Sequence, residues 1–200
     1  MRFIVYIKRD RAYQSYTVET EKTLTLLELL ELIKEQDPTL SFRQMCRAGI
    51  CGTCGVLLNS KPVLACKTML SESASELKID PLPNYPQVKD LVVDSRNACL
   101  KLPLFTPAKS QLPKNAHECI RCGICDSVCP VLNTGVFAGP MLFVRLNALS
   151  EESKPYEVMH PELCTHCMAC SRSCPKNVMP ESIISQFSPK SFSFDFLSGL

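Results

Sequence analysis

The stretches CRAGICGTCG (residues 46–55), CIRCGICDSVCP (residues 119–130) and CTHCMACSRSCP (residues 164–175) decide how this chain folds. The first reads Cys-x4-Cys-x2-Cys and is followed by a distant fourth cysteine, Cys66, which is the plant-type spacing of a [2Fe–2S] site. Each of the other two reads Cys-x2-Cys-x2-Cys-x3-Cys-Pro, the spacing of bacterial [4Fe–4S] sites. Twelve of the 13 cysteines belong to these sets, and only Cys99 is left over. The pattern indicates a protein that holds a row of iron–sulfur clusters and transfers electrons.

The spacing also predicts which cysteines share a cluster. In two-cluster ferredoxins the first three cysteines of a run bind one cluster, and the fourth, before proline, binds the other. The predicted ligands of the [2Fe–2S] cluster are Cys46, Cys51, Cys54 and Cys66. Those of a [4Fe–4S] cluster are Cys119, Cys122, Cys125 and Cys174. Those of a further [4Fe–4S] cluster are Cys129, Cys164, Cys167 and Cys170.

Three glycines lie within the first cysteine motif. Gly49, Gly52 and Gly55 give the backbone the conformational freedom to wrap closely around a small cluster. We expect an alanine at any of these positions to strain the loop.

Two other uses of cysteine fit the sequence less well. Disulfides suit short secreted chains, but the start MRFIVYIKRD (residues 1–10) has no signal-peptide pattern and the number of cysteines is odd. Structural zinc takes four ligands, whereas each later run has a cubane-binding pattern that ends in proline. Cys99 is expected to be a small buried side chain in a helix.

Composition limits the classes of function. The 22 basic and 20 acidic side chains give a net charge of +2, which argues against a nucleic-acid binder held by phosphate contacts. The longest apolar stretch, LTLLELLELI (residues 24–33), contains two glutamates and is too short to span a bilayer. The chain has no glycine-rich dinucleotide turn and no candidate proton-transfer pair, so we expect no catalytic residues. A soluble or peripheral protein of the cytoplasm is expected.

The first half predicts a sheet with one helix. Alternating residues 2–7 and 13–19 predict a β-hairpin, and a leucine stripe predicts a helix that Thr23 or Thr25 caps and Asp37-Pro38 ends. Segments 56–58 and 63–65 predict a second hairpin around the turn 59–62, and LKID (residues 77–80) a further strand. The prolines of PLPNYP (residues 81–86) exclude regular structure, and a helix is expected over about residues 88–102.

These elements predict an α+β fold in two domains. Residues 1–102 form a β-grasp plant-type [2Fe–2S] ferredoxin domain, and the proline-rich residues 103–114 form a linker. Residues 115–200 form an all-helical bacterial-type two-cluster ferredoxin domain, with the cysteine runs starting 45 residues apart and a helix over residues 141–149. The tail SFSFDFLSGL (residues 191–200) is either a frayed terminus or a strand that docks on a partner.

The order of these motifs resembles the iron–sulfur subunit of succinate dehydrogenase and fumarate reductase. The likeness also includes IDPLPNYPQVKDLVVD (residues 79–94) and the pair Gly139-Pro140. It implies an electron-transfer subunit of the tricarboxylic acid cycle or of anaerobic respiration. Such a subunit relays single electrons between an FAD flavoprotein subunit, which the first domain faces, and a membrane anchor or quinone-reactive subunit at the last cluster. The anchor would hold the chain at the inner membrane.

Two departures from that family affect the far end of the chain. The family's third cluster is usually [3Fe–4S], because the second position of the last run is not cysteine, whereas Cys167 stands there and favours [4Fe–4S]. A tryptophan usually follows the first Cys-Pro in the quinone pocket, whereas this chain has none and reads VLNTGVF (residues 131–137).

The alternative to this family is the iron–sulfur subunit of another flavoprotein complex, of the thiol-linked fumarate reductase or glycolate-oxidase type, with a soluble cysteine-rich partner. A freely diffusing ferredoxin is disfavoured by the weak net charge.

Five further residues lie near the motifs. His117 and His166 either tune a cluster, replace a thiolate as in Rieske centres, or make a hydrogen bond or face solvent, and the last of these is favoured because every cysteine is available. His160 is expected to be a loop residue. Arg47 and Arg121 each follow a predicted ligand, and they either offset cluster charge or are solvated surface residues.

Overall fold

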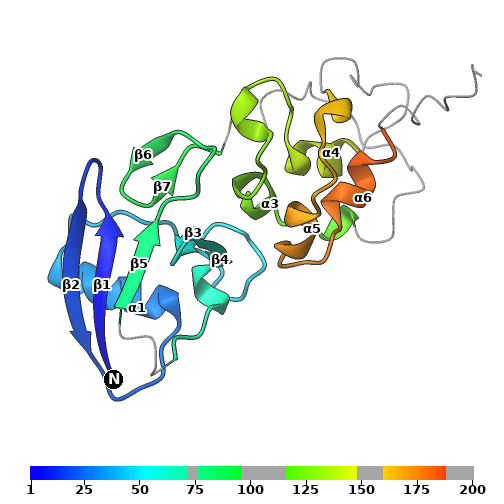
Figure 1. Cartoon of the computed structure of the whole chain (residues 1–200). Coiled ribbons are helices and arrows are strands. Elements are labelled where there is room, and N and C mark those ends of the chain that lie inside the picture. The colour runs from blue at the N-terminus through cyan, green and yellow to red at the C-terminus, as the bar shows by residue number, and fades with distance from the viewer. Residues whose placement is uncertain (72–75, 96–115, 148–159, 188–200) are drawn as a thin grey trace, which may run out of the picture.

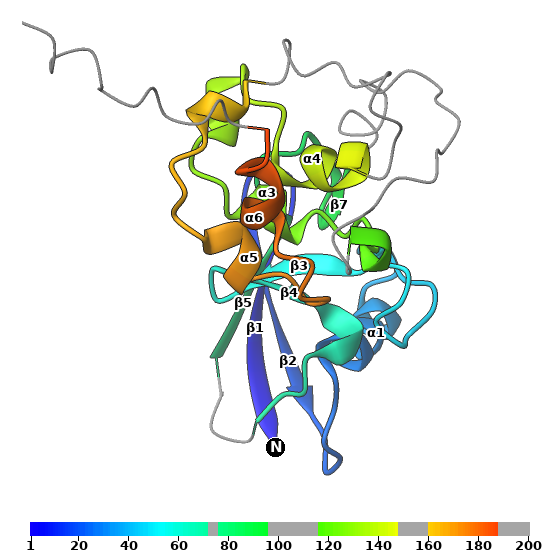
Figure 2. The same cartoon turned by 90° about the vertical axis from the view of Figure 1, so that its right-hand side faces the viewer.

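The computed structural model describes residues 1–71, 76–95, 116–147 and 160–187. Residues 1–71 and 76–95, which we call the first part of the chain, form strands and one α-helix (Figure 1). Residues 116–147 and 160–187, which we call the second part, form short helices beside it. In the view turned by 90°, the helical part stands above the β3–β4 end of the sheet (Figure 2). No helix among these residues is long and apolar enough to cross a membrane.

The sheet has five strands in the order β2-β1-β5-β3-β4. Their bounds are Arg2–Lys8 (β1), Tyr13–Glu19 (β2), Gly55–Leu58 (β3), Lys61–Leu64 (β4) and Glu76–Asp80 (β5). β1 and β5 are parallel and the other pairs are antiparallel. Phe3, Val5 and Ile7 alternate along β1 with more exposed residues and are buried, as one covered face requires. The predicted first hairpin is confirmed.

One helix, α1 (Leu26–Gln36), covers the sheet. Its buried side chains belong to the same apolar core as Phe3, Val5 and Ile7. The Thr25 hydroxyl accepts a hydrogen bond from the Glu28 amide at 3.2 Å, and the Glu28 carboxylate accepts one from the Thr25 amide at 2.7 Å. This capping box supplies partners for two backbone amides at the helix start. Thr25 is therefore the cap, and the predicted helix is confirmed.

The β3–β4 hairpin has a two-residue turn, shorter than the predicted turn over residues 59–62. Asn59 and Ser60 both have positive φ, 47° and 66°, which matches the turn geometry favoured between twisted antiparallel strands. Lys61 and Pro62 are already part of β4. The 3-10 helix η1 (Ala65–Lys67) follows, and the Ala65 amide donates to the Cys54 carbonyl at 3.0 Å. The hairpin thereby returns Cys66 to the first cysteine loop.

The predicted helix over residues 88–102 is wrong where the structure describes it. Residues 87–93 form a small hairpin instead, with strands β6 (Gln87–Lys89) and β7 (Val92–Val93). Asp90 has φ 48° in the turn, and its buried carboxylate accepts hydrogen bonds from the Ser41 amide and from Arg9, both at 2.8 Å. These distant partners outweigh the local helical pattern. Residues 96–102, including Cys99, lie outside the described residues.

Arg9 joins the hairpins of the first part. Its guanidinium donates to Asp90 at 2.8 Å, to Asp37 at 2.7 Å and to the Tyr16 hydroxyl at 2.7 Å. The Asp90 side chain is 2% exposed and that of Arg9 is 18% exposed. Hydrogen bonds from Thr39, Tyr16 and Arg9 hold the pKa of Asp37 below its usual range. Stabilisation from Asp37 is therefore present at neutral pH and is lost as the pH falls through that depressed pKa.

The described residues of the second part form short helices joined by loops, with no strand, as predicted. Its α-helices are α3 (Ile124–Ser127), α4 (Pro140–Asn147), α5 (Ala169–Arg172) and α6 (Pro180–Ile184). Its 3-10 helices are η2 (Ala116–Glu118), η3 (Leu132–Thr134) and η6 (Pro161–Leu163). Gly139, with φ 96°, precedes Pro140 at the start of α4. The predicted linker 103–114 and the tail 191–200 lie outside the described residues, so both remain predictions.

The helical part has a core of its own. Phe137, Phe143 and Phe187 stack in a row, with successive ring centroids 5.6 Å and 5.9 Å apart. Ile183 and Ile184 of α6 are buried in the same cluster. Four cysteines pack against this core, and two more form a second small cluster with Met141: Cys119, Cys129, Cys164 and Cys174 in the first case, Cys125 and Cys170 in the second.

We predict that Arg9→Met lowers the free energy of unfolding by about 3 kcal/mol, because it leaves the buried Asp90 carboxylate without its counter-charge. Chemical denaturation of the cluster-loaded protein measures this loss. Arg2→Met is the matched control, since the pair Arg2–Glu19 is exposed on both sides and such pairs contribute about 0–1 kcal/mol. Equal losses in the two variants would contradict the role given to Arg9.

Candidate iron–sulfur cluster sites

The loop over residues 46–54 turns its backbone amides toward a sulfur atom. The amides of Ala48, Ile50 and Cys51 donate to Cys46 Sγ at 3.4, 3.4 and 3.3 Å. Positive φ at Gly49 (70°) and Gly52 (71°) gives the loop this curl, as the sequence predicts. Gly55 has no positive φ and is needed for space instead, because a Cβ there would lie 2.9 Å from Leu82 Cδ1.

This loop favours a charged sulfur even without metal. The Ala48 amide contributes most to lowering the pKa of Cys46 to about 6, followed by the Cys51 thiol and the amides of Ile50 and Cys51. Thiolates, not thiols, are metal ligands. Cys46 is therefore prepared to bind iron.

The other thiols of this set meet in a second pair. Cys54 and Cys66 are 5% and 8% exposed and hydrogen bond to each other, and burial raises the pKa of Cys54 to about 11. Cys46 likewise pairs with Cys51. A [2Fe–2S] cluster has two irons that each need two thiolates from the protein. The four cysteines fit such a cluster, with one pair for each iron.

The second cysteine set lines a cavity, which we call the second cavity. It brings together the first three cysteines of the run at residues 119–130 and the last cysteine of the run at residues 164–175. It lies between apolar side chains that include Met141, Val144 and Val178. The cysteines that line it are Cys119, Cys122, Cys125 and Cys174. Burial raises the pKa of the Cys122 thiol to about 11, and it raises the pKa of Cys119 and Cys125 as well.

A third cavity has the reciprocal composition, with the last cysteine of the run at residues 119–130 and the first three of the run at residues 164–175. The cysteines that line it are Cys129, Cys164, Cys167 and Cys170. Burial raises the pKa of Cys170 to about 11, whereas Cys167 is exposed. The structure thus groups the cysteines in the crossed sets that the spacing predicts, while the iron ligation itself remains a prediction.

These cavities suit clusters better than single ions. Among the described residues, no group of three or more His, Cys, Asp or Glu side chains is arranged to hold one metal ion. The ligands of a cluster bind different irons and line a larger space, as four thiols do in the second and third cavities. Buried thiols gain their charge when iron binds, because a coordinating thiol loses its proton.

The histidines near the motifs make contacts outside the cavities. His166 Nδ1 lies 2.8 Å from Glu181 Oε1 and 3.3 Å from Ser185 Oγ, and the side chain is 49% exposed. His160 Nδ1 lies 2.8 Å from Glu162 Oε1. His117 is exposed in η2. None of the three lines a cysteine cavity, so the hydrogen-bonded or solvent-facing reading is the better one for each.

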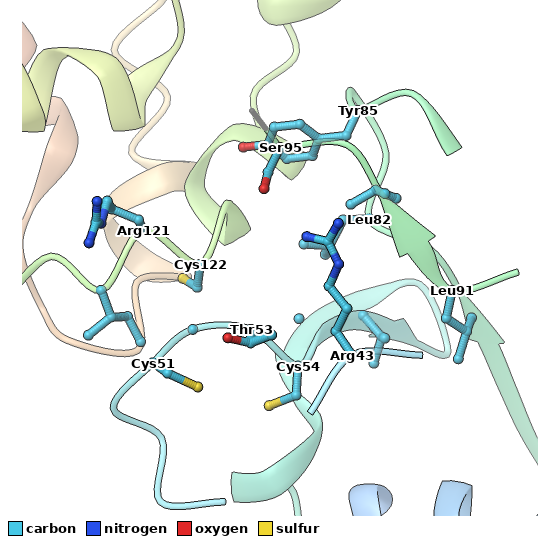
Figure 3. A pocket seen from close by; sticks show the side chains of 15 residues that line it. Arg43, Cys51, Thr53, Cys54, Leu82, Tyr85, Leu91, Ser95, Arg121 and Cys122 are labelled. Carbon is cyan, nitrogen blue, oxygen red and sulfur yellow. The ribbon is translucent and has the colours of Figure 1, made fainter. Parts of the chain in front are cut away.

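The two arginines beside predicted ligands are surface residues. Arg47 is 60% exposed and pairs with Glu31. Arg121 is exposed and lines the space between the two parts of the chain (Figure 3). Figure 3 also shows Cys122, from the second set, facing the loop that carries Cys51 and Cys54.

Sequence reasoning missed one buried polar group at this junction. The Asp126 carboxylate is almost fully buried and accepts hydrogen bonds from the Met141 amide and the Tyr85 hydroxyl, both at 2.8 Å. Burial raises the pKa of Asp126 to about 6, although these donors lower it. Asn84 Nδ2 donates to the Asp126 carbonyl at 2.7 Å. A charged residue directly after Cys125, in a run otherwise free of acids, is the signal that could have revealed it.

Comparison with known families supports both halves of the chain. A family model described as a 2Fe-2S iron-sulfur cluster binding domain matches residues 3–99. A second one, described as a 4Fe-4S dicluster domain, matches residues 115–178.

Curated relatives match along most of their length. The fumarate reductase iron-sulfur subunit of Escherichia coli is 34% identical over 212 residues, covering 91% of this chain and 86% of the relative. That of Haemophilus influenzae is 29% identical, covering 93% and 89%. The succinate dehydrogenase iron-sulfur subunit of Coxiella burnetii is 31% identical, covering 80% of each.

A solved structure has the same fold. A chain of the Mycobacterium smegmatis Sdh1 complex in the apo form aligns with a TM-score of 0.78 at 23% identity, covering 93% of both chains.

We predict that Cys51→Ser changes or removes one binuclear EPR signal and leaves the cubane signals in place, because Cys51 belongs only to the first cysteine set. The measurement is EPR of the reduced protein together with iron counting. Cys99→Ser is the matched control and should alter no signal, since it replaces the one cysteine outside the three sets. Loss of a cubane signal in Cys51→Ser, with the binuclear signal intact, would show the assignment to be wrong.

Proposed function

The chain belongs to the family of fumarate reductase and succinate dehydrogenase iron–sulfur subunits, and from this premise we propose that it relays single electrons through three clusters. In this proposal one end of the relay is an FAD flavoprotein subunit, where succinate and fumarate interconvert. The other end is a quinone-linked or other redox partner. The bound clusters supply one-electron chemistry, and the protein supplies their ligands, their spacing and their shielding.

The observation that carries this proposal is the succession of three cysteine sets. The second and third sets each line a cavity of their own, and Cys51 and Cys54 of the first set share a pocket with Cys122 of the second set where the two parts of the chain touch. Such a series provides a path along the chain from the first loop to the third cavity. A protein that binds one cluster for structural reasons would not need three in contact.

Exposed apolar side chains surround the first cluster loop. Met45, Ile50 and Met69 are 70%, 65% and 60% exposed, and each lies within three residues of a cysteine of the first set. Solvent-exposed apolar groups gathered on one surface mark interaction sites. This surface, the first-loop rim, is where the flavoprotein subunit docks in our proposal, because electrons must enter or leave by the first cluster.

Apolar residues are also exposed near the third cavity. Leu163 and Met179 are 38% and 41% exposed, and Cys167 itself is exposed. This end faces the second partner, a membrane anchor or quinone-reactive subunit. The chain would then lie in the cytoplasm and be peripheral on the inner membrane through that subunit.

A second candidate partner is a soluble cysteine-rich protein, as in complexes of the thiol-linked fumarate reductase or glycolate-oxidase type. Two observations favour it: Cys167 lines the third cavity, and the chain contains no tryptophan with which to build the family's quinone pocket. Isolation of the native complex distinguishes the two, since only one of them brings a membrane-spanning subunit.

We predict that the purified subunit, free of flavin, does not oxidise succinate with an artificial dye, and that adding the flavoprotein restores electron transfer. Ile50→Glu should weaken the binding of the flavoprotein at least tenfold, because it places a charge on the first-loop rim. Val88→Glu is the matched control, since Val88 is 62% exposed on β6, outside the cysteine loops. Dye reduction by the subunit alone, or equal binding of the two variants, would contradict this proposal.

We predict that the third cluster is [4Fe–4S], with Cys167 as its fourth ligand. Cys167→Ser should then convert it to a three-iron centre, visible by EPR in the oxidised state and as the loss of one iron. The protein must be purified without air, because oxidation can also remove an iron. A three-iron signal in the unmodified protein that the substitution leaves unchanged would show that Cys167 is not a ligand.

A further inference from the structure

The first and second cluster loops are in backbone contact, and Gly52 makes that contact possible. A Cβ at Gly52 would lie 2.5 Å from the Ile120 carbonyl oxygen and 3.0 Å from both Cα and Cβ of Cys122. Real Cβ atoms do not approach other atoms this closely, so only glycine fits. Gly52 is bonded directly to Cys51, and Cys122 belongs to the second cysteine set.

A neighbouring glycine extends the contact. A Cβ at Gly55 would lie 3.2 Å from the Cys122 carbonyl oxygen. Gly52 follows Cys51, and Gly55 follows Cys54. Both glycines, each next to a cysteine of the first set, therefore face Cys122. The loops that carry the two cysteine sets are therefore in close contact here.

Hydrogen bonds beside this contact join the first part of the chain to the loop of the second cysteine set. Tyr85, from the first part, donates to the Asp126 carboxylate at 2.8 Å, and Asn84 donates to the Asp126 carbonyl at 2.7 Å. Asp126 is tied in turn to the start of α4 by the Met141 amide. Gly123 admits the Tyr85 ring, since a Cβ there would lie 2.8 Å from the Tyr85 hydroxyl oxygen. We call the hydrogen-bonded group of Asn84, Tyr85, Asp126 and the Met141 amide the junction clamp.

We propose that the contact between Gly52 and Cys122 is the route by which electrons pass between the first and second clusters, and that Gly52 is a positioning residue for that transfer. The inference rests on the proposed function. The bound clusters would exchange one electron, and no bond would be made or broken. Tunnelling weakens exponentially with distance and is weaker across a gap than along bonds. The distance across this gap therefore controls the rate, and the junction clamp keeps it short.

The test separates this contact from the folding of the loop. Gly52→Asn widens the gap, and asparagine tolerates positive φ better than most residues do. Gly135→Asn is the matched control: its φ of 75° is close to the 71° of Gly52, but it lies outside the cysteine loops and a Cβ there meets nothing within 4 Å. Both variants of the full chain are loaded with clusters and their two-iron EPR signals are compared.

Two measurements then report on the gap. With both clusters reduced, EPR measures the magnetic coupling that broadens the two-iron signal. A laser flash with a dissolved photosensitiser injects one electron, and the phase whose rate does not depend on protein concentration measures transfer within the molecule. We expect Gly52→Asn to weaken the coupling and slow that phase several-fold, while Gly135→Asn keeps the values of the unmodified protein.

Each outcome decides the proposal. Unmodified coupling and rate in Gly52→Asn, or equal losses in the two variants, would overturn it. If Gly52→Asn does not bind the first cluster, Gly55→Ala replaces it, because that position has no positive φ and its Cβ still presses on Cys122; unchanged values there would likewise overturn the proposal. Neither succinate, fumarate nor a partner is present, so a failure of the proposed function appears only in the reconstitution assay.

Discussion

Iron in a sulfur cluster needs a tetrahedron of sulfur ligands, and this constraint governs the fold, because the thiols that meet around each site are far apart in the sequence. Cys66 reaches the first loop only because the turn at Asn59 and Ser60 reverses the chain and the Ala65 amide bonds to the Cys54 carbonyl. Cys174 and Cys129 are exchanged between two runs that start 45 residues apart. The helices of the second part connect the segments that carry these cysteines, and all of the described ones are short.

Iron binding would add to the stability that the buried thiols already contribute. Cys54 and Cys66 belong to the apolar core of the first part, and Cys125 and Cys170 belong to a small cluster with Met141. Burial raises the pKa of Cys54, Cys122 and Cys170 to about 11, which favours the neutral thiols, and bound iron would supply the positive charge that thiolates need. Metal binding and folding would therefore be coupled.

Features that depend on neighbouring residues could be predicted from the sequence. The capping box of Thr25 and Glu28, the leucine stripe of α1 and the spacing of the cysteines are all local patterns, and the structure contains them. The prediction of a helix over residues 88–102 is wrong in its described residues, because the Asp90 carboxylate accepts hydrogen bonds from Arg9 and Ser41, which no local pattern reveals. The bond between Tyr85 and Asp126 joins residues 41 apart in the sequence and escaped notice for the same reason. Gly52 was predicted to give freedom to its own loop, whereas its missing side chain also admits the other half of the chain.

The exposure of the three sites differs in a way that suits a relay. The first loop is rimmed by exposed Met45 and Ile50, and the third site has the exposed Cys167. All three sets also contain buried thiols: Cys54 and Cys66 in the first, Cys125 in the second and Cys170 in the third. In the relay that we propose, partners dock at the exposed side chains of the two end sites, and the second set lies between them, with Cys122 sharing a pocket with Cys51 and Cys54. Because tunnelling weakens so steeply with distance, the middle site would exchange electrons fastest with its two neighbours. Electrons that enter at one end are thus directed along the chain to the other, and the contact at Gly52 becomes the step that joins the two halves.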